Sequence, residues 1–317
     1  MNHNSIKISV CIPAYNRPEL LIPLLDSILS QKYTNYEIVI CEDASPMREQ
    51  IRNIVDGYKI KWPGLFHYYE NEKNLGYDGN IRNLIAKASG DYCFFMGNDD
   101  LMHPKALESV ASAIARHENI GAVLRTYASF DDSPENINQV FRYFENETFF
   151  PAGPDTITTF YRRSVVISGL VLHREEALKY STDIFDGTLL YQLYLVANIL
   201  INMNGVFSPE ILALYRNGGI PDFGNSEKEK GKFVPNIQTP ESSIHFMRGM
   251  LDIVKWTEEN RNVEIVKRIV TDIGNYCYPI LSIQAKQPLK VFIKYVYQFA
   301  KLGFWKNKMF YLYFLSL

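Results

Sequence analysis

The stretch Ile6–Gln31, IKISVCIPAYNRPELLIPLLDSILSQ, predicts a strand followed directly by a helix. Its first half is a continuous apolar run with β-branched residues, which is typical of a buried strand. Its second half repeats leucine and isoleucine at spacings of three and four from Leu20 to Leu29, as one face of a helix does. Pro18 suits the first turn of this helix, whereas Pro23 falls at a position where proline can kink it.

The alternation of strand and helix continues to residue 130. Further strands are predicted at YEIVICED (36–43), LFHYYEN (65–71), DYCFFMG (91–97) and IGAVLRTYASF (120–130), and the segments between them have helical spacing. Strands separated by helices of this length imply βαβ units, so we expect an α/β fold with a mostly parallel central sheet flanked by helices. Ligands of such sheets bind beyond the carboxyl ends of the strands, where polar residues that follow several strands should meet in one crevice.

The composition is that of an ordinary globular chain of 317 residues, with 47% hydrophobic and 21% charged residues. A formal net charge of −2 gives no general attraction for nucleic acid, which is therefore not an expected partner. The four cysteines show no C-x-x-C spacing and indicate buried, reduced thiols of a cytoplasmic protein. No run of 18 apolar residues occurs, so no membrane-spanning segment is expected.

The last part of the chain differs in composition from the rest. Residues 217–240 are rich in Gly, Pro and charge and predict a flexible loop or linker, and residues 241–317 predict a helical C-terminal extension. No acidic residue follows Asp272, while lysines accumulate among aromatic and apolar residues: Lys286, Lys290, Lys294, Lys301, Lys306 and Lys308. Two interpretations stay open, namely a helix that lies on an anionic membrane surface, with Phe292, Ile293, Val296 and Phe299 beside the lysines, or a helix that packs on the main domain.

Three side chains with oxygen donors, Asn98, Asp99 and Asp100, follow the predicted strand 91–97. Mn²⁺ or Mg²⁺ prefers oxygen ligands and often binds through one or two carboxylates together with the phosphates of a substrate. The pair Asp99 and Asp100 therefore predicts a metal site. Because Asp is also common in turns and at helix N-caps, the pair alone is weak evidence.

Three segments, in order over about the first 110 residues, together resemble the family-2 glycosyltransferases of bacterial surface-polysaccharide type, which have the GT-A fold. They are ISVCIPAYNRPELLIPLLDSILSQ, YEIVICEDAS and NEKNLGYDGNIRNLIAKASGDYCFFMGNDD. The first is similar to the family's opening strand, nucleotide-facing turn and first helix. The second is similar to a strand that ends in an acidic pair, and the third contains N-x-G-x-x-x-x-R-N ahead of the metal motif.

The resemblance implies a nucleotide-binding set in the first half of the chain. Asp43 would accept a hydrogen bond from the N3–H of uracil or thymine, which predicts a UDP- or dTDP-sugar donor; a turn or N-cap role is the alternative. The other expected nucleotide-binding residues are Pro13, Ala14, Tyr15 and Arg17 around the base, Gly76 for close backbone approach, Arg82 near the diphosphate and Asn98 at the ribose.

The metal motif departs from the family's D-x-D-D, because Gly97 stands where its first acid would be. Asp99 falls on the metal-binding position, and the missing carboxylate leaves metal dependence open. An inverting transfer also needs a general base in the acceptor half. We expect Asp186 to fill this role, ahead of Asp183, Glu175 and Glu176, with a helix N-cap role for Asp186 as the alternative.

The resemblance thus implies an enzyme that moves a sugar from its nucleotide carrier to a hydroxyl of a glycan, including a lipid-linked oligosaccharide, with residues 1–105 holding the donor and residues 106–216 the acceptor. Q-x-x-R-W is absent, which favours a single transfer over processive synthesis. A cytoplasmic location, peripheral at the inner face of the cell membrane, is the matching expectation. A nucleotidyltransferase or dehydrogenase is disfavoured because their Gly-rich loops are absent, and a non-catalytic scaffold with this fold stays as an alternative.

Overall fold

The computed structural model describes residues 3–219 and 222–317, and its described strands form one sheet in the order β3-β2-β1-β4-β9-β6-β10-β5, with β7 paired to β6 and β8 paired to β10. β1 pairs in parallel with β2 and β4, β2 with β3, and β6 with β10, while β9 runs antiparallel between β4 and β6. The strands are β1 (Ile8–Ala14), β2 (Tyr36–Glu42), β3 (Phe66–Glu70), β4 (Tyr92–Phe95), β5 (Leu101–Met102), β6 (Ile120–Phe130), β7 (Ile137–Phe141), β8 (Thr148–Phe150), β9 (Val171–His173) and β10 (Asn204–Arg216).

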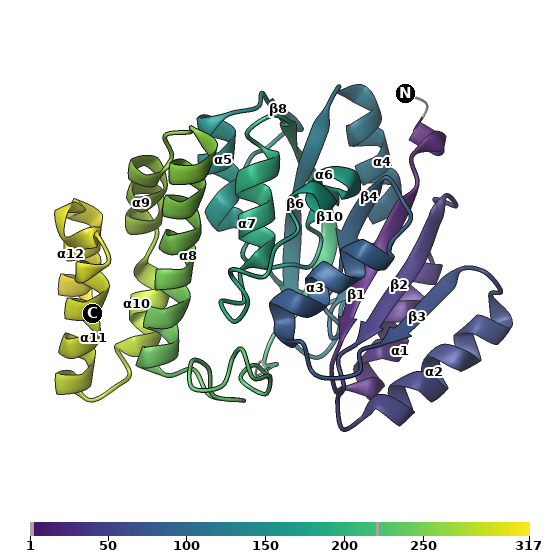
Figure 1. Ribbon diagram of the computed structural model, residues 1–317, viewed down its shortest axis with the longest axis horizontal. Helices are drawn as coiled ribbons and strands as arrows, with labels where there is room; N and C mark the ends of the chain where they lie inside the picture. Colours follow the sequence, from purple (N-terminus) through teal and green to yellow (C-terminus); the bar gives the residue numbers. More distant parts are fainter. Residues whose placement is uncertain (1–2, 220–221) are drawn as a thin grey trace.

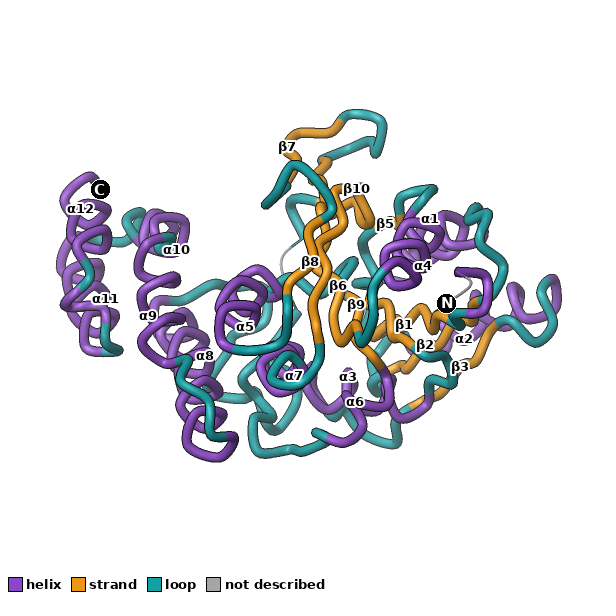
Figure 2. Tube along the Cα trace, turned by 90° about the horizontal axis from the view of Figure 1, so that it is seen from above, coloured by secondary structure: helices purple, strands orange, loops and turns teal. Residues whose placement is uncertain are grey.

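Helices cover both faces of this sheet, with α1 and α4 on one side and α3 and α6 on the other (Figure 2). Each face buries its own apolar core against the strands. The helices are α1 (Pro18–Leu29), α2 (Arg48–Lys61), α3 (Gly76–Lys87), α4 (Ala106–Arg116), α5 (Pro154–Tyr161), α6 (Arg174–Lys179), α7 (Tyr191–Ile199), α8 (Pro240–Arg261), α9 (Val266–Asn275), α10 (Tyr278–Gln284), α11 (Leu289–Lys301) and α12 (Lys308–Ser316). The expected α/β architecture with a mostly parallel sheet is confirmed.

The second half of the sheet differs in detail from the sequence prediction. β7 and β8 lie in residues 131–157. The hydrophobic pattern of this segment is weak, because both strands are short and β7 is largely exposed. Helix α7 covers only Tyr191–Ile199 of the apolar run 189–203, and every residue of it is buried, so no polar face distinguishes it in the sequence. Within the predicted helical extension 241–317, the first helix ends at Arg261, and Asn262 after it takes a left-handed conformation with φ of 51°.

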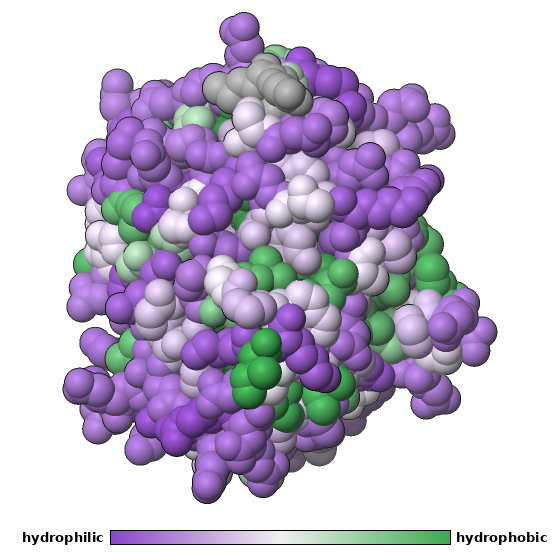
Figure 3. Space-filling model, turned by 90° about the vertical axis from the view of Figure 1, so that its right-hand side faces the viewer, coloured by the Kyte–Doolittle hydropathy of each residue, from purple (hydrophilic) through white to green (hydrophobic). Residues whose placement is uncertain are grey.

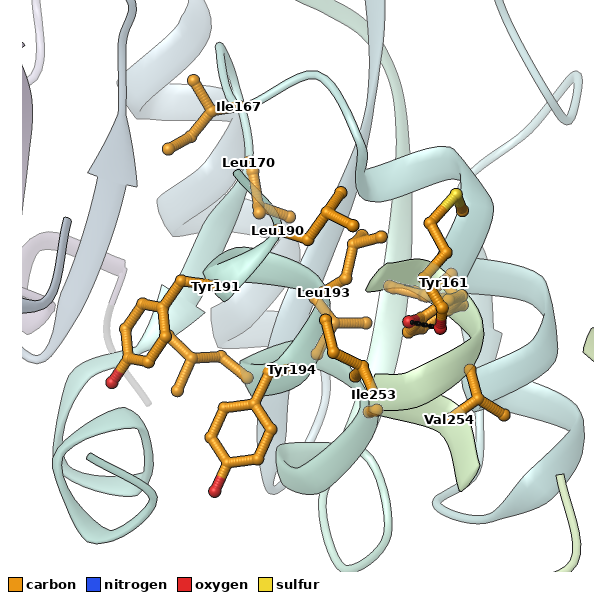
Figure 4. Close-up of a cluster of buried hydrophobic side chains, with 14 of the residues drawn as sticks. Tyr161, Ile167, Leu170, Leu190, Tyr191, Leu193, Tyr194, Ile253 and Val254 are labelled. Atoms are coloured by element: carbon orange, nitrogen blue, oxygen red, sulfur yellow. Dashed lines mark hydrogen bonds between the residues drawn. The ribbon is translucent and has the colours of Figure 1, made fainter. Parts of the chain in front are cut away.

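A second layer of helices packs on α7 and extends away from the sheet (Figure 1). Buried side chains of α5, α7 and α8 interlock there, including Tyr161, Leu193 and Val254 (Figure 4). The Tyr161 hydroxyl donates a hydrogen bond of 2.7 Å to the Met250 carbonyl, so that its buried polar atom is paired.

α11 and α12 form the outermost layer, at the yellow end of the chain in Figure 1. Phe292, Val296 and Phe299 of α11 are buried, whereas Ile293 is 50% exposed. Most of the apolar side chains that were considered for membrane contact therefore pack on the protein. Among residues 3–219 and 222–317, no helix combines the length and apolar character needed to cross a bilayer.

The two halves of the chain, 1–105 and 106–216, share this single sheet, and their division into donor and acceptor parts stays a prediction.

All four cysteines are free and buried. Residues 222–240 of the expected linker contact the rest of the molecule through buried Ser226 and Glu229.

Candidate functional site

A cavity of about 400 Å³ lies at the carboxyl ends of β1, β2 and β4, where the crevice was expected. It is lined by most of the residues predicted from the sequence: Pro13, Tyr15, Arg17, Asp43, Gly76, Asn98, Asp99 and Asp100. Three predicted residues, Ala14, Arg82 and Asp186, are not among its described lining residues.

Asp43 is a buried carboxylate that caps the start of α3. It accepts hydrogen bonds from the backbone N–H of Leu75 (2.8 Å), the backbone N–H of Gly76 (3.0 Å) and the side chain of Asn71 (2.7 Å). Its own N–H donates to the Ala14 carbonyl at 3.0 Å, which is the part Ala14 takes here. Burial raises the pKa of Asp43 to about 6, although these hydrogen bonds act in the opposite direction and lower it. A carboxylate has about four acceptor positions, so one remains for a ligand.

The turn after β1 is held in an unusual conformation. Asn16 and Arg17 both have φ of 55°, a left-handed conformation that costs of order 1 kcal/mol for residues other than glycine. The Asn98 amide donates to the carbonyls of Asn16 (3.1 Å) and Tyr15 (3.3 Å) and so fixes the turn. The turn directs the Arg17 guanidinium onto the Asp99 carboxylate, with which it forms a salt bridge.

Asp100 does not fit the role of metal ligand that the sequence suggested. It is 3% exposed and accepts hydrogen bonds from the Ser168 hydroxyl (2.5 Å) and the Arg216 N–H (2.9 Å). Burial, with the charge of Asp99 as a second cause, raises the pKa of Asp100 to about 7. Asp100 thus ties the end of β10 to the loop before β9, and Asp99 remains as the partly exposed carboxylate of the pair.

The donor atoms at Asp99 fit a divalent ion that takes most of its ligands from a substrate. No group of three or more His, Cys, Asp or Glu side chains suited to a metal occurs in the described part of the chain. Asp99 lines the cavity, and its carboxylate is already paired with a cation, the Arg17 guanidinium. Mg²⁺ and Mn²⁺ can be held by one carboxylate plus phosphate oxygens, so the single acid is compatible with either ion.

Arg82 and Asp186, predicted as separate ligand-binding and catalytic residues, bind each other. The Nη1 and Nη2 atoms of Arg82 lie 2.6 and 2.9 Å from the two carboxylate oxygens of Asp186, and Arg82 also donates to the Thr182 carbonyl at 2.9 Å. Asp183, Glu175 and Glu176, the other acids considered as a base, are also not among the described lining residues of the cavity.

Asp78 is a fully buried carboxylate that the sequence analysis missed. It accepts four backbone hydrogen bonds of 2.8 to 3.0 Å, from Gly187, Thr188, Leu189 and Tyr191. Burial raises the pKa of Asp78 to about 6. These bonds hold Leu189, which lines the cavity, in a left-handed conformation with φ of 65°. In the sequence, Asp78 resembles an ordinary acid in the first turn of a helix.

The segment after β10 brings a second carboxylate to the start of α3. Glu229 is buried and accepts hydrogen bonds from the N–H groups of Tyr77 (2.8 Å) and Gly224 (2.9 Å). Gly76 has φ of 78°, and a Cβ there would lie 2.5 Å from the Ser226 hydroxyl. The glycine at position 76 therefore permits both the turn and the close approach of this segment. Glu229 was missed because residues 217–240 read as a linker.

Asp222 belongs to the same segment and also lines the cavity. Its carboxylate accepts hydrogen bonds from two neutral amides, Asn16 at 2.6 Å and Asn225 at 3.0 Å. Phe223 packs edge-on against Tyr77, with ring centroids 5.6 Å apart. Asp222 is thus a cavity carboxylate that no arginine or lysine engages in a described ion pair.

A fully buried arginine shapes the far wall of the cavity. The Arg125 guanidinium donates to the carbonyls of Ser168 (3.0 Å), Arg163 (2.9 Å) and Val166. Burial without a described carboxylate partner lowers the pKa of Arg125. These bonds fold the chain so that Val165, Val166 and Ser168 line the cavity.

The family model described as "Glycosyl transferase family 2" matches residues 9–178. Among curated proteins, the chain is 36% identical over 100 residues to abequosyltransferase RfbV of Salmonella typhimurium, covering 32% of this chain and 30% of that protein. It is also 36% identical over 107 residues to the poly(ribitol-phosphate) beta-N-acetylglucosaminyltransferase TarP of Staphylococcus aureus, covering 33% of this chain and 32% of that protein. The chain therefore spans about a third of the length of these two relatives.

Solved structures share the fold at low sequence identity. S. aureus TarS 1–349 in complex with UDP-GlcNAc matches 94% of this chain and 80% of that chain, with a TM-score of 0.65 and 16% identity. The mannosyltransferase PcManGT of Pyrobaculum calidifontis in complex with GDP-Man and Mn²⁺ matches 98% and 85%, with a TM-score of 0.55 and 15% identity. These likenesses bear on the fold, which is that of GT-A glycosyltransferases.

Proposed function

The chain belongs to glycosyl transferase family 2, and from that premise we propose that it transfers a sugar from a UDP- or dTDP-sugar to a hydroxyl of a glycan. The observation that carries the proposal is the cavity at the carboxyl ends of β1, β2 and β4, which brings Asp43 and Asp99 into one space. One acid suits a nucleobase and the other suits the cation that accompanies a diphosphate.

The nucleobase would lie beside Asp43, with Pro13 and Tyr15 on either side of it. Asp43 has one acceptor position left over from its three hydrogen bonds, and the N3–H of uracil or thymine is the donor that fits it. Cytosine and purines offer no such donor in the same place. Support comes from TarS, a protein of the same fold whose solved complex contains a uracil nucleotide sugar, UDP-GlcNAc.

Mn²⁺ or Mg²⁺ would bind at Asp99, and the ion would supply positive charge to the leaving diphosphate. Arg17 would turn from Asp99 to the phosphates, because a guanidinium binds phosphate oxygens as readily as a carboxylate. Asn98 holds the turn that carries Arg17, so its contribution to donor binding is to position this arginine.

We assign the general base to Asp222 in place of Asp186. Both oxygens of Asp186 are held by Arg82, and Asp186 is not among the described lining residues of the cavity, so it is poorly placed to meet an acceptor hydroxyl. Asp222 lines the cavity, its hydrogen-bond donors among the described residues are amides, and it can take the proton of the acceptor hydroxyl while that oxygen attacks the anomeric carbon. Attack from the side opposite the diphosphate gives inversion in a single transfer.

The C-terminal layer is the proposed contact with an anionic membrane, which would bring the enzyme to lipid-linked acceptors. Leu289, Ile293, Tyr297, Trp305 and Leu315 are all at least half exposed, and six lysines lie in the same region. The face at the opposite end, on the α2 side, is mostly hydrophilic (Figure 3). Aromatic and apolar side chains with lysines between them suit a lipid–water interface. Truncation after Gln287 should abolish sedimentation with phosphatidylglycerol vesicles, and unchanged sedimentation would contradict this contact.

Calorimetric titration of UDP, dTDP, CDP and GDP, with and without Mn²⁺, tests the donor proposal. UDP or dTDP should bind with preference over CDP and GDP, and Asp43→Asn should remove the preference. An absence of binding by all four nucleotides would contradict the transferase proposal and favour a non-catalytic scaffold. Release of UDP from UDP-sugars by the wild-type chain would argue against a scaffold.

A further inference from the structure

A second cavity of about 600 Å³ adjoins the first one. Val165 and Val166 line both cavities, so the two cavities are separated by little more than these side chains. Its walls come from β6 and β7 and from the region of α10 and α12, which rise on the same side of the molecule in Figure 2. Its volume is in the range of sites for small ligands.

Five tyrosines dominate the lining of this second cavity: Tyr127, Tyr143, Tyr276, Tyr278 and Tyr313. Tyr276 is 55% exposed, with the Arg162 guanidinium over one face of its ring at 4.2 Å from the centroid, and Tyr278 is 44% exposed. Part of each ring is therefore open to a ligand. The face of an aromatic ring carries negative charge and attracts the weakly positive C–H groups of a sugar ring, while phenol hydroxyls hydrogen-bond to sugar hydroxyls. A cavity of this lining suits a saccharide.

Two arginines give the same cavity a positive charge. Arg162 and Arg163 share one carboxylate, Asp272, at 2.7 and 3.7 Å, which leaves one positive charge in excess. Asp272 is not among the described lining residues, and none of those is acidic. The excess charge is therefore available to an anionic ligand.

Arg163 also has an unused donor. Its Nε is buried and has no hydrogen-bond partner among the described residues. Its Nη1 donates to the Thr159 carbonyl at 2.9 Å, and the guanidinium lies over the Tyr143 ring with 5.4 Å to the centroid. A buried N–H without a partner costs stability, and a phosphate oxygen would relieve that cost.

We propose that this second cavity binds the acceptor, and that the acceptor is a saccharide carrying a phosphate group, with sugar rings on the tyrosines and phosphate at Arg162 and Arg163. The inference rests on the proposed glycosyl transfer and adds the chemical class of the acceptor. Because Val165 and Val166 line both cavities, the acceptor hydroxyl would reach the donor sugar past these two side chains.

Binding of four probes to the full chain saturated with UDP tests the proposal: glucose 1-phosphate, methyl glucoside, inorganic phosphate and farnesyl diphosphoglucose. Glucose 1-phosphate should bind at least about tenfold more tightly than methyl glucoside or inorganic phosphate, since it alone of the three satisfies both parts of the cavity. Tighter binding of farnesyl diphosphoglucose than of glucose 1-phosphate supports a lipid-linked source. Equal affinity supports a lipid-free, phosphate-containing glycan.

Arg163→Gln and Tyr278→Ala should each weaken glucose 1-phosphate binding by about tenfold or more, while UDP still binds as in the wild-type chain. Tyr278 is exposed enough that its variant should fold even if Arg163→Gln does not. Arg116→Gln, at an exposed arginine paired with Glu147, is the matched control and should change neither affinity. Two results would overturn this inference and leave the proposed function standing. One is unchanged glucose 1-phosphate binding in Tyr278→Ala, and the other is a wild-type chain that binds UDP but does not bind glucose 1-phosphate. A wild-type chain that does not bind UDP overturns the proposed function and this inference with it.

Discussion

Arg82 on α3 and Asp186 in the loop before α7 form a two-pronged salt bridge, with nitrogen–oxygen distances of 2.6 and 2.9 Å. The Asp186 side chain is only 7% exposed. Removing one member of such a pair leaves the other charge buried without a partner. We expect Asp186→Asn to lower the free energy of unfolding by about 3 kcal/mol and to change nucleotide affinity little. Urea unfolding and UDP titration would check the two effects.

A double-mutant cycle with Arg82→Met isolates the pair from other effects. The double variant should be more stable than the sum of the single losses predicts, because it leaves no buried charge unpaired. A kcat that falls by about a thousandfold in Asp186→Asn with stability unchanged would instead identify Asp186 as the general base.

Asp222→Asn should act on the chemical step. Loss of a general base typically lowers the rate by about 10² to 10⁴-fold. UDP binding should stay within about twofold, because in this proposal Asp222 acts on the acceptor hydroxyl and Asp43 contacts the nucleobase. Steady-state kinetics with a UDP-sugar and an acceptor would measure kcat. Asp132→Asn, at an exposed acid, is the control and should leave kcat unchanged. An unaltered kcat in Asp222→Asn would exclude the base assignment.

The first half of the fold was predictable because its strands and helices carry strong periodic patterns and lie in chain order. Asp43 and Asp99 could be placed in one crevice because both directly follow parallel strands, whose carboxyl ends meet. The partners of Arg82 and Asp100 could not be predicted, because Asp186 and Ser168 are distant in the chain and no local signal links them. Glu229 and Asp222 were hidden in a segment whose composition resembles a linker.

Asp99 and Asp100 are adjacent in the chain, yet their variants should differ in effect. Asp99→Asn should remove the tightening of UDP binding by Mn²⁺, which for coupled ligands is roughly 5- to 150-fold, and should leave the melting temperature nearly unchanged. Asp100→Ala should lower the free energy of unfolding by about 1–3 kcal/mol, since the Ser168 hydroxyl and the Arg216 N–H lose their acceptor. Calorimetry with and without Mn²⁺, together with thermal melting, separates the two. A metal effect that persists in Asp99→Asn would contradict the site.

The raised pKa of Asp43, about 6, predicts how stability and donor binding depend on pH. The folded state binds this proton more tightly than the unfolded chain, so the stabilisation is fully present below about pH 4 and is lost as pH rises through about 6. Donor binding has the opposite dependence, because only the ionised carboxylate has its acceptor positions free for the N3–H of the base. UDP-glucose, whose diphosphate does not titrate in this range, should bind about tenfold more weakly at pH 5 than at pH 8. Asp43→Asn should bind weakly at every pH, and a wild-type affinity that is flat between pH 5 and 8 would contradict an Asp43 that both contacts the nucleobase and titrates near pH 6.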